Sequence, residues 1–126
     1  MESIKNFKTK SQLIFFKALE KIKSLSDNER KEYYSYVRSL PSLIVFNGLI
    51  NTLLYYKSKR EKVYEHISLI FEDIFQNYKK FKNNNSNKDL IDYISTLDFN
   101  SLRLVTNDIF LISLYLKRVA ESELKN

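Results

Sequence analysis

A single glycine and a single proline in 126 residues limit the fold of this chain more than any other feature of its sequence. The tight turns of β-hairpins use glycine for positive φ and proline for a fixed φ. With one residue of each kind, the chain can build few such turns. The composition therefore argues against a β-rich fold and favours helices.

The spacing of apolar residues supports the same conclusion. In three stretches they recur at steps of three, four or seven residues, the period of one face of a helix. The sequence therefore predicts three amphipathic helices. Their apolar faces comprise Ile4, Phe7, Ile14, Ala18, Ile22 and Leu25, then Val63, Ile67, Ile70, Ile74, Tyr78 and Phe81, and finally Leu102, Val105, Ile109, Ile112, Leu116 and Val119.

Local signals indicate where further helices begin and end. The segment Ser26-Asp27-Asn28 offers an N-cap for a second helix, and Ser39-Leu40-Pro41 predicts where that helix ends. Pro41 also suits the first turn of a third helix, where its missing N–H costs nothing. We expect this third helix to reach about Lys59 and a fourth to begin near Glu61.

The second half of the chain contains one clear loop. Residues 82–87 are rich in asparagine, whose side chain competes with helical hydrogen bonds. A short fifth helix is expected at residues 88–97, and Asp98 or Asn100 then caps the last helix. We therefore predict an all-α fold, a single domain over residues 1–126 built as a bundle of about six helices.

The third expected helix contains the only glycine, Gly48, directly after Asn47. Glycine inside a helix costs roughly 1 kcal/mol relative to alanine, so we expect it to allow the close approach of a neighbouring backbone. Apolar residues cover most of this helix, which predicts a buried central position. Asn47 would then need a hydrogen-bond partner. Pro41, Asn47 and Gly48 are accordingly expected to be structural.

The net charge of +6 is concentrated in the first half of the chain. Residues 1–62 carry 13 basic and 6 acidic side chains, whereas residues 63–126 carry 8 basic and 9 acidic ones. A one-sided positive field attracts polyanions such as nucleic acids. Solubility and a lysine-rich composition explain the same excess, so charge alone leaves both interpretations open.

Basic side chains cluster at three places and could neutralise phosphates without reading sequence. One cluster lies at the end of the third helix, where lysines also complement the helix dipole. Nearby tyrosines could stack on bases, although most are expected to fill the core or an interface. The candidate cations are Lys57, Lys59 and Arg60, then Lys17 and Lys21, and finally Lys117 and Arg118; the tyrosines are Tyr33, Tyr34, Tyr36, Tyr55 and Tyr56.

The chain offers little for catalysis. It has no cysteine, which excludes thiolate chemistry and disulfides, and one glycine cannot form a glycine-rich phosphate loop. His66 is the only histidine, and its place beside Glu65 is typical of a surface or half-buried residue. We therefore expect a protein that is not an enzyme, with no catalytic residue, no metal and no cofactor.

The sequence also argues against a membrane partner. The longest uncharged apolar run, residues 40–56, is interrupted by polar residues and is shorter than the roughly 20 residues that a spanning helix needs. No apolar signal core follows the N-terminus. We therefore expect a cytoplasmic protein.

Two segments, taken together, resemble a known family. The first is residues 40–56, LPSLIVFNGLINTLLYY, and the second is residues 114–121, LYLKRVAE. In order and spacing they are similar to the small subunit of the Cmr-type (type III-B) CRISPR RNA-guided effector complex, a small all-helical protein. The segments cover about a fifth of the chain. Thr52 stands where the family often has alanine, and the tryptophans common in relatives are absent.

The resemblance implies a non-catalytic structural role in antiviral defence. Several copies would stack along the effector against the backbone subunit and would help to hold target RNA paired to guide RNA. Lys117 and Arg118 match the family motif and are the RNA-binding residues that it implies. Asn47 and Gly48 match it as structural residues. The remaining cations, Lys17, Lys21, Lys57, Lys59 and Arg60, depend on charge clustering alone.

Other readings stay open from the sequence. A helical protein–protein interaction module would use the basic half to bind an acidic partner and would not bind nucleic acid. The small subunit of the sister Csm-type complex is an alternative within the same class. A small helical enzyme would require an activity that depends on His66.

Overall fold

The computed structural model describes residues 9–124, and every regular element in this range is an α-helix, which confirms the predicted all-α fold. Ile4 and Phe7, expected on the first apolar face, lie outside the described residues. The helices are α2 (Lys10–Lys23), α3 (Asp27–Val37), α4 (Leu40–Asn47), α5 (Leu49–Lys59), α6 (Glu61–Ile74), α7 (Gln76–Asn84), α8 (Leu90–Ile94) and α9 (Phe99–Leu124).

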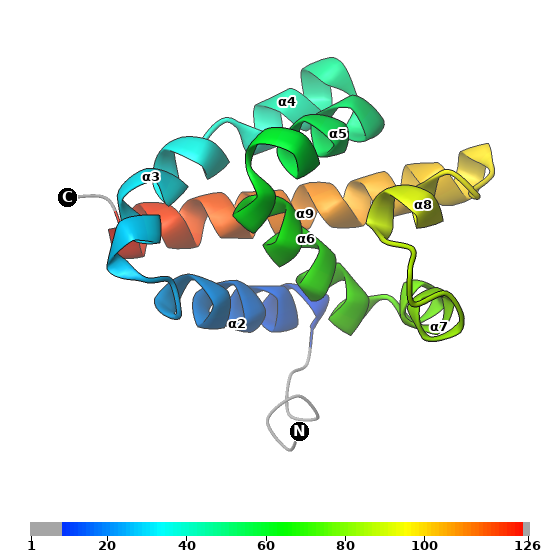
Figure 1. The fold of residues 1–126 in the computed structure, drawn as a ribbon, viewed down its shortest axis with the longest axis horizontal. Helices are drawn as coiled ribbons and strands as arrows, with labels where there is room; N and C mark the ends of the chain where they lie inside the picture. The colour runs from blue at the N-terminus through cyan, green and yellow to red at the C-terminus, as the bar shows by residue number, and fades with distance from the viewer. Residues whose placement is uncertain (1–8, 125–126) are drawn as a thin grey trace.

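The long helix α9 is the axis of the bundle (Figure 1). It contacts α2, α3, α4 and α6. Helix α2 runs along one side of it, and α4 and α5 lie on the opposite side. Helix α6 joins the two sides through its contacts with α5, α2 and α9. Helices α7 and α8 lie at the end of the molecule where α9 begins.

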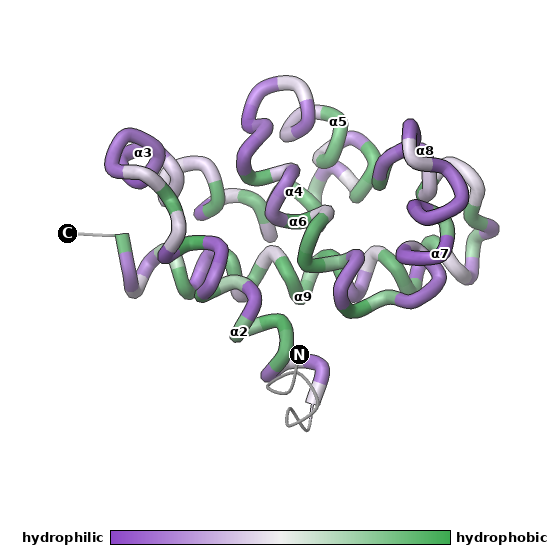
Figure 2. The backbone as a smooth tube through the Cα atoms, turned by 60° about the horizontal axis from the view of Figure 1, so that its bottom comes forward, coloured by the Kyte–Doolittle hydropathy of each residue, from purple (hydrophilic) through white to green (hydrophobic). Residues whose placement is uncertain are grey.

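The core is formed by the apolar faces that the sequence predicts for α2, α6 and α9. Ile14, Ile22, Ile67, Ile109 and Leu116 are all fully buried. Apolar and hydrophilic residues alternate along the helices, as expected when each helix turns one face to a shared core (Figure 2). Burying one such side chain contributes about 1.5–3 kcal/mol, so these faces dominate the stability of the bundle.

Side-chain caps define several helix starts. Ser26 Oγ accepts a hydrogen bond from the backbone N–H of Glu29 at 3.3 Å, and the Glu29 carboxylate accepts one from the N–H of Ser26 at 2.9 Å. Before α9, Asp98 Oδ1 accepts a hydrogen bond from the N–H of Ser101 at 2.8 Å. The cap predicted within residues 26–28 is therefore confirmed and is Ser26, and Asp98 rather than Asn100 caps the last helix.

The third expected helix is in fact two helices that form a hairpin. Helix α4 ends at Asn47 and α5 begins at Leu49, because Gly48 has φ +82° and ψ 160°, a conformation that only glycine adopts readily. A Cβ at Gly48 would meet no heavy atom within 4 Å. The prediction that Gly48 lies inside a continuous helix to allow close packing is therefore wrong; it permits a change of chain direction.

The prediction that this segment is a buried central helix is also wrong. Val45 is 63% exposed and Phe46 is 83% exposed. Asn47 is exposed as well, so it carries no buried amide. Helix α9 takes the central position instead, because its length lets it contact both sides of the bundle. Pro41, in contrast, lies buried in the first turn of α4, as predicted.

The fourth expected helix is also divided. Phe75 adopts an extended conformation, with φ −124° and ψ 100°, between α6 and α7. Near the break, Phe75 stacks on Phe71 with ring centroids 4.9 Å apart, and Tyr78 packs 5.4 Å from Phe71 and 5.2 Å from Tyr93 of α8. Aromatic rings of α6, α7 and α8 therefore surround the point where the helix breaks.

The asparagine-rich loop is shorter than predicted at its start, because α7 continues to Asn84. The short fifth helix is confirmed, although α8 covers only part of residues 88–97. Asp89 caps α8 by accepting a hydrogen bond from the backbone N–H of Asp92 at 3.4 Å.

Candidate nucleic-acid interface

The first basic cluster lies at the C-terminal end of α5. Lys57 forms an ion pair with Asp89, with Nζ and Oδ2 2.8 Å apart. Burial alone would raise the pKa of Asp89, but hydrogen bonds from Lys57 and Tyr64 outweigh it and lower the pKa to about 2. Lys59 is exposed and forms no ion pair with any residue from 9 to 124. Of these two lysines, only Lys59 has no carboxylate partner among the described residues.

Arg60 follows directly after α5 and is held between two aromatic rings. Its Cζ lies 4.1 Å from the ring centroid of Tyr36 on α3 and 5.9 Å from that of Tyr55 on α5. Its Nη1 donates a hydrogen bond to the backbone oxygen of Lys59 at 3.0 Å. Cation–π contacts of this kind contribute about 0.5–1 kcal/mol at exposed sites and orient the guanidinium plane. The Arg60 side chain is therefore positioned without a carboxylate.

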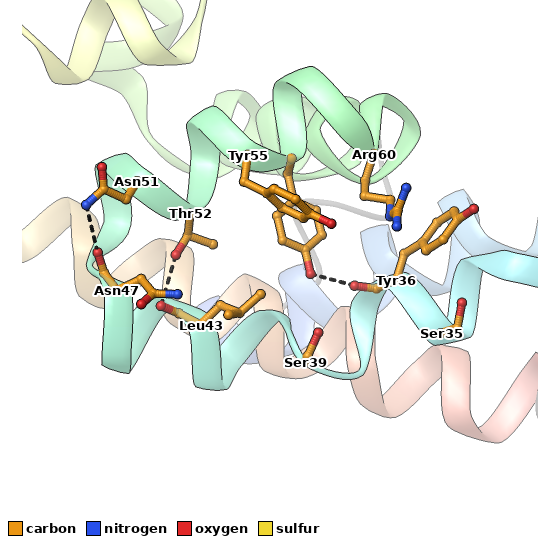
Figure 3. A pocket seen from close by; sticks show the side chains of 10 residues that line it. Ser35, Tyr36, Ser39, Leu43, Asn47, Asn51, Thr52, Tyr55 and Arg60 are labelled. Atoms are coloured by element: carbon orange, nitrogen blue, oxygen red, sulfur yellow. Dashed lines mark hydrogen bonds between the residues drawn. The ribbon is translucent and has the colours of Figure 1, made fainter.

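Arg60 lies at one end of a groove of about 630 Å³, which we name the hairpin groove (Figure 3). Tyr36 and Arg60 lie at one end of it, Tyr55 lies between, and Asn47 and Asn51 lie at the other end. Its lining residues come from α3, from the turn before α4, from the α4–α5 hairpin and from Arg60. They are Ser35, Tyr36, Ser39, Leu43, Asn47, Asn51, Thr52, Tyr55, Tyr56 and Arg60.

Two hydrogen bonds from buried side chains hold the walls of the hairpin groove together. Thr52 Oγ1 donates to the backbone oxygen of Leu43 at 2.9 Å and so joins α5 to α4. The Tyr56 hydroxyl donates to the backbone oxygen of Tyr36 at 2.6 Å and so joins α5 to α3. These bonds satisfy polar groups that would otherwise be costly to bury.

The two candidate lysines of α2 lie in different surroundings. Lys17 Nζ lies 3.4 Å from Asp73 on α6 and 4.0 Å from Glu20, and its side chain is only 14% exposed. Lys21 is half-buried, and its charge is one of several that affect His66. Lys17 therefore joins two helices, and this leaves little of its charge for an outside phosphate.

The motif residues Lys117 and Arg118 lie in the C-terminal half of α9. Lys117 is half-buried and Arg118 is exposed. Neighbouring positions on a helix do not share a face, so the two cations point in different directions. Arg118 lines a hollow of about 360 Å³ between α2 and α9, and Lys23 of α2 lines the same hollow.

The structure therefore brings the sequence-predicted residues together only in part. Lys59 and Arg60 adjoin the hairpin groove or line it, whereas Arg118 lines a separate hollow; the two cavities share no lining residue. Sequence reasoning missed Lys23 and Asn51. Lys23 could have been found, because it lies with Lys21 in the basic last turn of the first helix. No local sequence pattern indicates that Asn51 and Arg60 line the same groove.

His66 lies in the interior and not at the surface, so the expectation of a surface or half-buried residue is corrected. It is 4% exposed, and its Nδ1 shares a hydrogen bond of 2.6 Å with the Tyr33 hydroxyl. Burial lowers the pKa of His66 to about 4 and raises that of Tyr33 well above its usual range. The pair is neutral at physiological pH and joins α3 to α6.

Two further structural findings apply to residues 9–124. Within that range, no three histidine, aspartate or glutamate side chains gather into a group suited to a metal ion. None of its helices combines the length and the apolar character that crossing a bilayer requires.

The described residues form an all-α bundle that carries, in the hairpin groove, a guanidinium beside amides and aromatic rings. A sequence model of the family described as "CRISPR-associated protein (Cas_Cmr5)" matches residues 10–123. The chain therefore belongs to this family, the small subunit of type III-B CRISPR effector complexes, and the resemblance found in the sequence is confirmed. Searches among curated proteins and among solved structures gave no match.

Proposed function

We propose that this chain is a non-catalytic structural subunit that binds RNA backbone within the type III-B effector. Copies of it stack along the complex beside the backbone subunit and contact guide and target RNA in the cytoplasm. The observation that carries this proposal is the family match over residues 10–123. Such a role needs no base-specific contact, because guide–target pairing supplies the specificity.

The charge arrangement supports the proposal. Among residues 9–124, the side chains of Lys59, Arg60, Lys117 and Arg118 form no ion pair with a carboxylate. Each can neutralise a phosphate without first breaking an ion pair among the described residues. Lys17 and Lys57 are already paired, and Lys21 is half-buried, so we rank these three below the others.

A charge-reversal experiment tests the motif residues. In the reconstituted effector, Lys117→Glu/Arg118→Glu should weaken target-RNA binding at least tenfold and reduce its salt dependence, because two phosphate contacts are replaced by repulsion. The matched control is Lys79→Glu/Lys80→Glu, an exposed adjacent pair on α7. If the α9 variant assembles and binds target RNA as the control does, Lys117 and Arg118 are not the contacts.

A second candidate function is a protein–protein interaction module without nucleic-acid binding. The observation that favours it is the exposed apolar surface of the α4–α5 hairpin, because contiguous surfaces of this kind mark interaction sites. Its exposed apolar residues are Val45, Phe46, Ile50 and Leu54.

Native mass spectrometry after co-purification separates the two functions. The first predicts that the chain is recovered with Cmr subunits and guide RNA. The second predicts a protein partner without RNA. Recovery with an acidic protein and no guide RNA would therefore contradict the proposed function.

A further inference from the structure

The hairpin groove has a chemistry that the charge clusters alone do not explain. It combines one guanidinium, two tyrosine rings beside it, two amide side chains and several hydroxyl groups. No carboxylate is among its lining residues. Two other hollows differ in this respect, since one is lined by Glu61, Glu65, Glu72 and Asp89 and another by Glu29 and Glu32. The hairpin groove is thus suited to an anionic ligand.

Arg60 supplies the anion-binding group of this groove. A guanidinium has five N–H donors, and the structure assigns one of them, on Nη1, to the Lys59 backbone. The contact with the Tyr36 ring at 4.1 Å already restricts the side chain. Binding a phosphate therefore costs less side-chain entropy than it would for a free arginine. Lys59, exposed and next in the chain, offers a second cation.

Tyr55 supplies a surface for a planar group. Its side chain is 44% exposed, and its ring meets that of Tyr56 edge-on, with centroids 5.4 Å apart. Tyr56 is buried and its hydroxyl is hydrogen-bonded to α3, so it gives Tyr55 a rigid support. An exposed aromatic ring beside a cation is the pairing that binds unpaired bases.

Asn47 and Asn51 supply polar groups at the far end of the groove. Asn51 Nδ2 donates to the backbone oxygen of Asn47 at 3.2 Å, which leaves its Oδ1 as an acceptor. Asn47 is exposed, and it is placed there because Gly48 ends α4 with a positive φ. Amides can both donate to and accept from the edges of an unpaired base. The Asn-Gly pair thus has a second role beyond the hairpin turn.

We propose that the hairpin groove binds an unpaired segment of single-stranded RNA, an assignment that rests on the proposed RNA-binding function and refines it. A phosphate contacts Arg60, a base stacks on Tyr55, and base edges face Asn47 and Asn51. Burial, followed by a hydrogen bond to the Glu32 carboxylate, raises the pKa of Tyr36, so its hydroxyl stays protonated. Glu32 itself does not line the groove.

Fluorescence anisotropy of the full chain with labelled single-stranded oligouridine and oligoadenine tests this proposal. Arg60→Gln should weaken binding about tenfold and lower the salt slope by about one, because one phosphate contact is lost. The matched control is Arg103→Gln, which removes an exposed arginine of α9 and should change affinity less than twofold. Equal losses for the two variants would overturn the proposal.

Tyr55 variants test stacking independently of charge. Tyr55→Ala should weaken binding about tenfold at all salt concentrations, whereas Tyr55→Phe should restore it, because base–aromatic stacking needs the ring and not the hydroxyl. Circular dichroism confirms that each variant folds. Unchanged binding by Tyr55→Ala, or failure of Tyr55→Phe to restore it, overturns the groove assignment.

A photo-crosslinking residue in place of Tyr55 in the assembled effector identifies the occupant directly. A crosslink to RNA supports the proposal, and a crosslink only to another subunit overturns it in favour of a protein segment.

The experiments distinguish failure of the groove assignment from failure of the proposed function. If Arg60→Gln binds like the wild type while Lys117→Glu/Arg118→Glu does not, the groove fails and the function stands. If the chain and the effector show no RNA contact at all, the function fails.

Discussion

The α2–α9 pair meets along a fully buried apolar seam, whereas the α4–α5 hairpin leaves several large apolar side chains exposed. Ile14 and Ile112 are fully buried, and Lys10 forms an ion pair with Asp108 at 2.8 Å. In the hairpin Phe46 is exposed, and the cation that follows α5, Arg60, contacts rings rather than a carboxylate. The comparison indicates that the buried α2–α9 seam maintains the fold, whereas the exposed side chains of the hairpin contribute less to stability.

The largest expected effect is in the α9 core. Ile112→Ala should lower the free energy of unfolding by about 2–5 kcal/mol, because it leaves a cavity in a close-packed interior. Phe46→Ser, its counterpart in the hairpin, should change the free energy by no more than about 0.5 kcal/mol, because the ring is already exposed. Urea denaturation of both variants measures the difference. Similar losses would mean that the hairpin also maintains the fold.

A smaller effect is expected from pH through His66. Its folded pKa of about 4 lies below the ordinary value of 6.5, so the unfolded chain takes up the proton first. Stability that is fully present above pH 6.5 should fall as the pH drops towards 4, by about 3 kcal/mol at most.

His66→Gln tests this directly, because glutamine can still bond to the Tyr33 hydroxyl but cannot take up a proton. Urea denaturation of the variant at several pH values should show a weaker pH dependence between 6.5 and 4. Loss of stability through protonation of Asp89 is expected in a lower pH range, below its ordinary pKa of 3.8, because the folded structure lowers this pKa to about 2. An identical slope in wild type and variant would exclude His66 as the source.

The next effect concerns the turn of the hairpin. Gly48→Ala should cost about 1–3 kcal/mol, because alanine at φ +82° and ψ 160° is strained although space for its Cβ exists. Asn47→Ala is the control and should have little effect on stability, since its side chain is exposed. Thermal unfolding compares them. A neutral Gly48→Ala would mean that the turn can relax into another conformation.

The smallest effect is expected for the ion pair that joins α5 to the cap of α8. Lys57→Met should cost at most about 1 kcal/mol, because the Lys57 side chain is nearly half exposed and solvent screens the pair. The substitution should nevertheless raise the pKa of Asp89. Burial opposes ionisation of this carboxyl, and the variant lacks one of the hydrogen bonds that favour the carboxylate. NMR titration of Asp89 measures this shift. An unchanged pKa would show that Tyr64 and the backbone N–H of Asp92 suffice to keep the carboxylate ionised.

Much of the fold could be predicted because its signals are local. The apolar faces of α2, α6 and α9 depend on spacing within one helix, and the Ser26 cap depends on a contact three residues away. The breaks at Gly48 and Phe75 were missed for different reasons. Glycine is compatible with either a close contact or a positive φ, and at Phe75 no local signal marks a break, although its ring packs edge-on against that of the distant Tyr93.

The candidate site was less predictable for the same reason. The sequence indicated Arg60 and the neighbouring lysines as cations, but it did not indicate which of them are paired within the protein. Lys57 and Lys17 are paired with Asp89 and Asp73, which lie far along the chain. Two residues with no sequence proximity, Tyr36 and Arg60, form the end of the hairpin groove.

The sequence by itself determined the helical class, the amphipathic faces, the cap region before α3 and the family. These features depend on composition and on short-range spacing, which the chain carries before it folds. Only the tertiary structure decided that Gly48 makes a hairpin, that α9 is central and that Arg60 lies between two rings. Each of these depends on contacts between distant segments, and only the packing of the whole chain determines them.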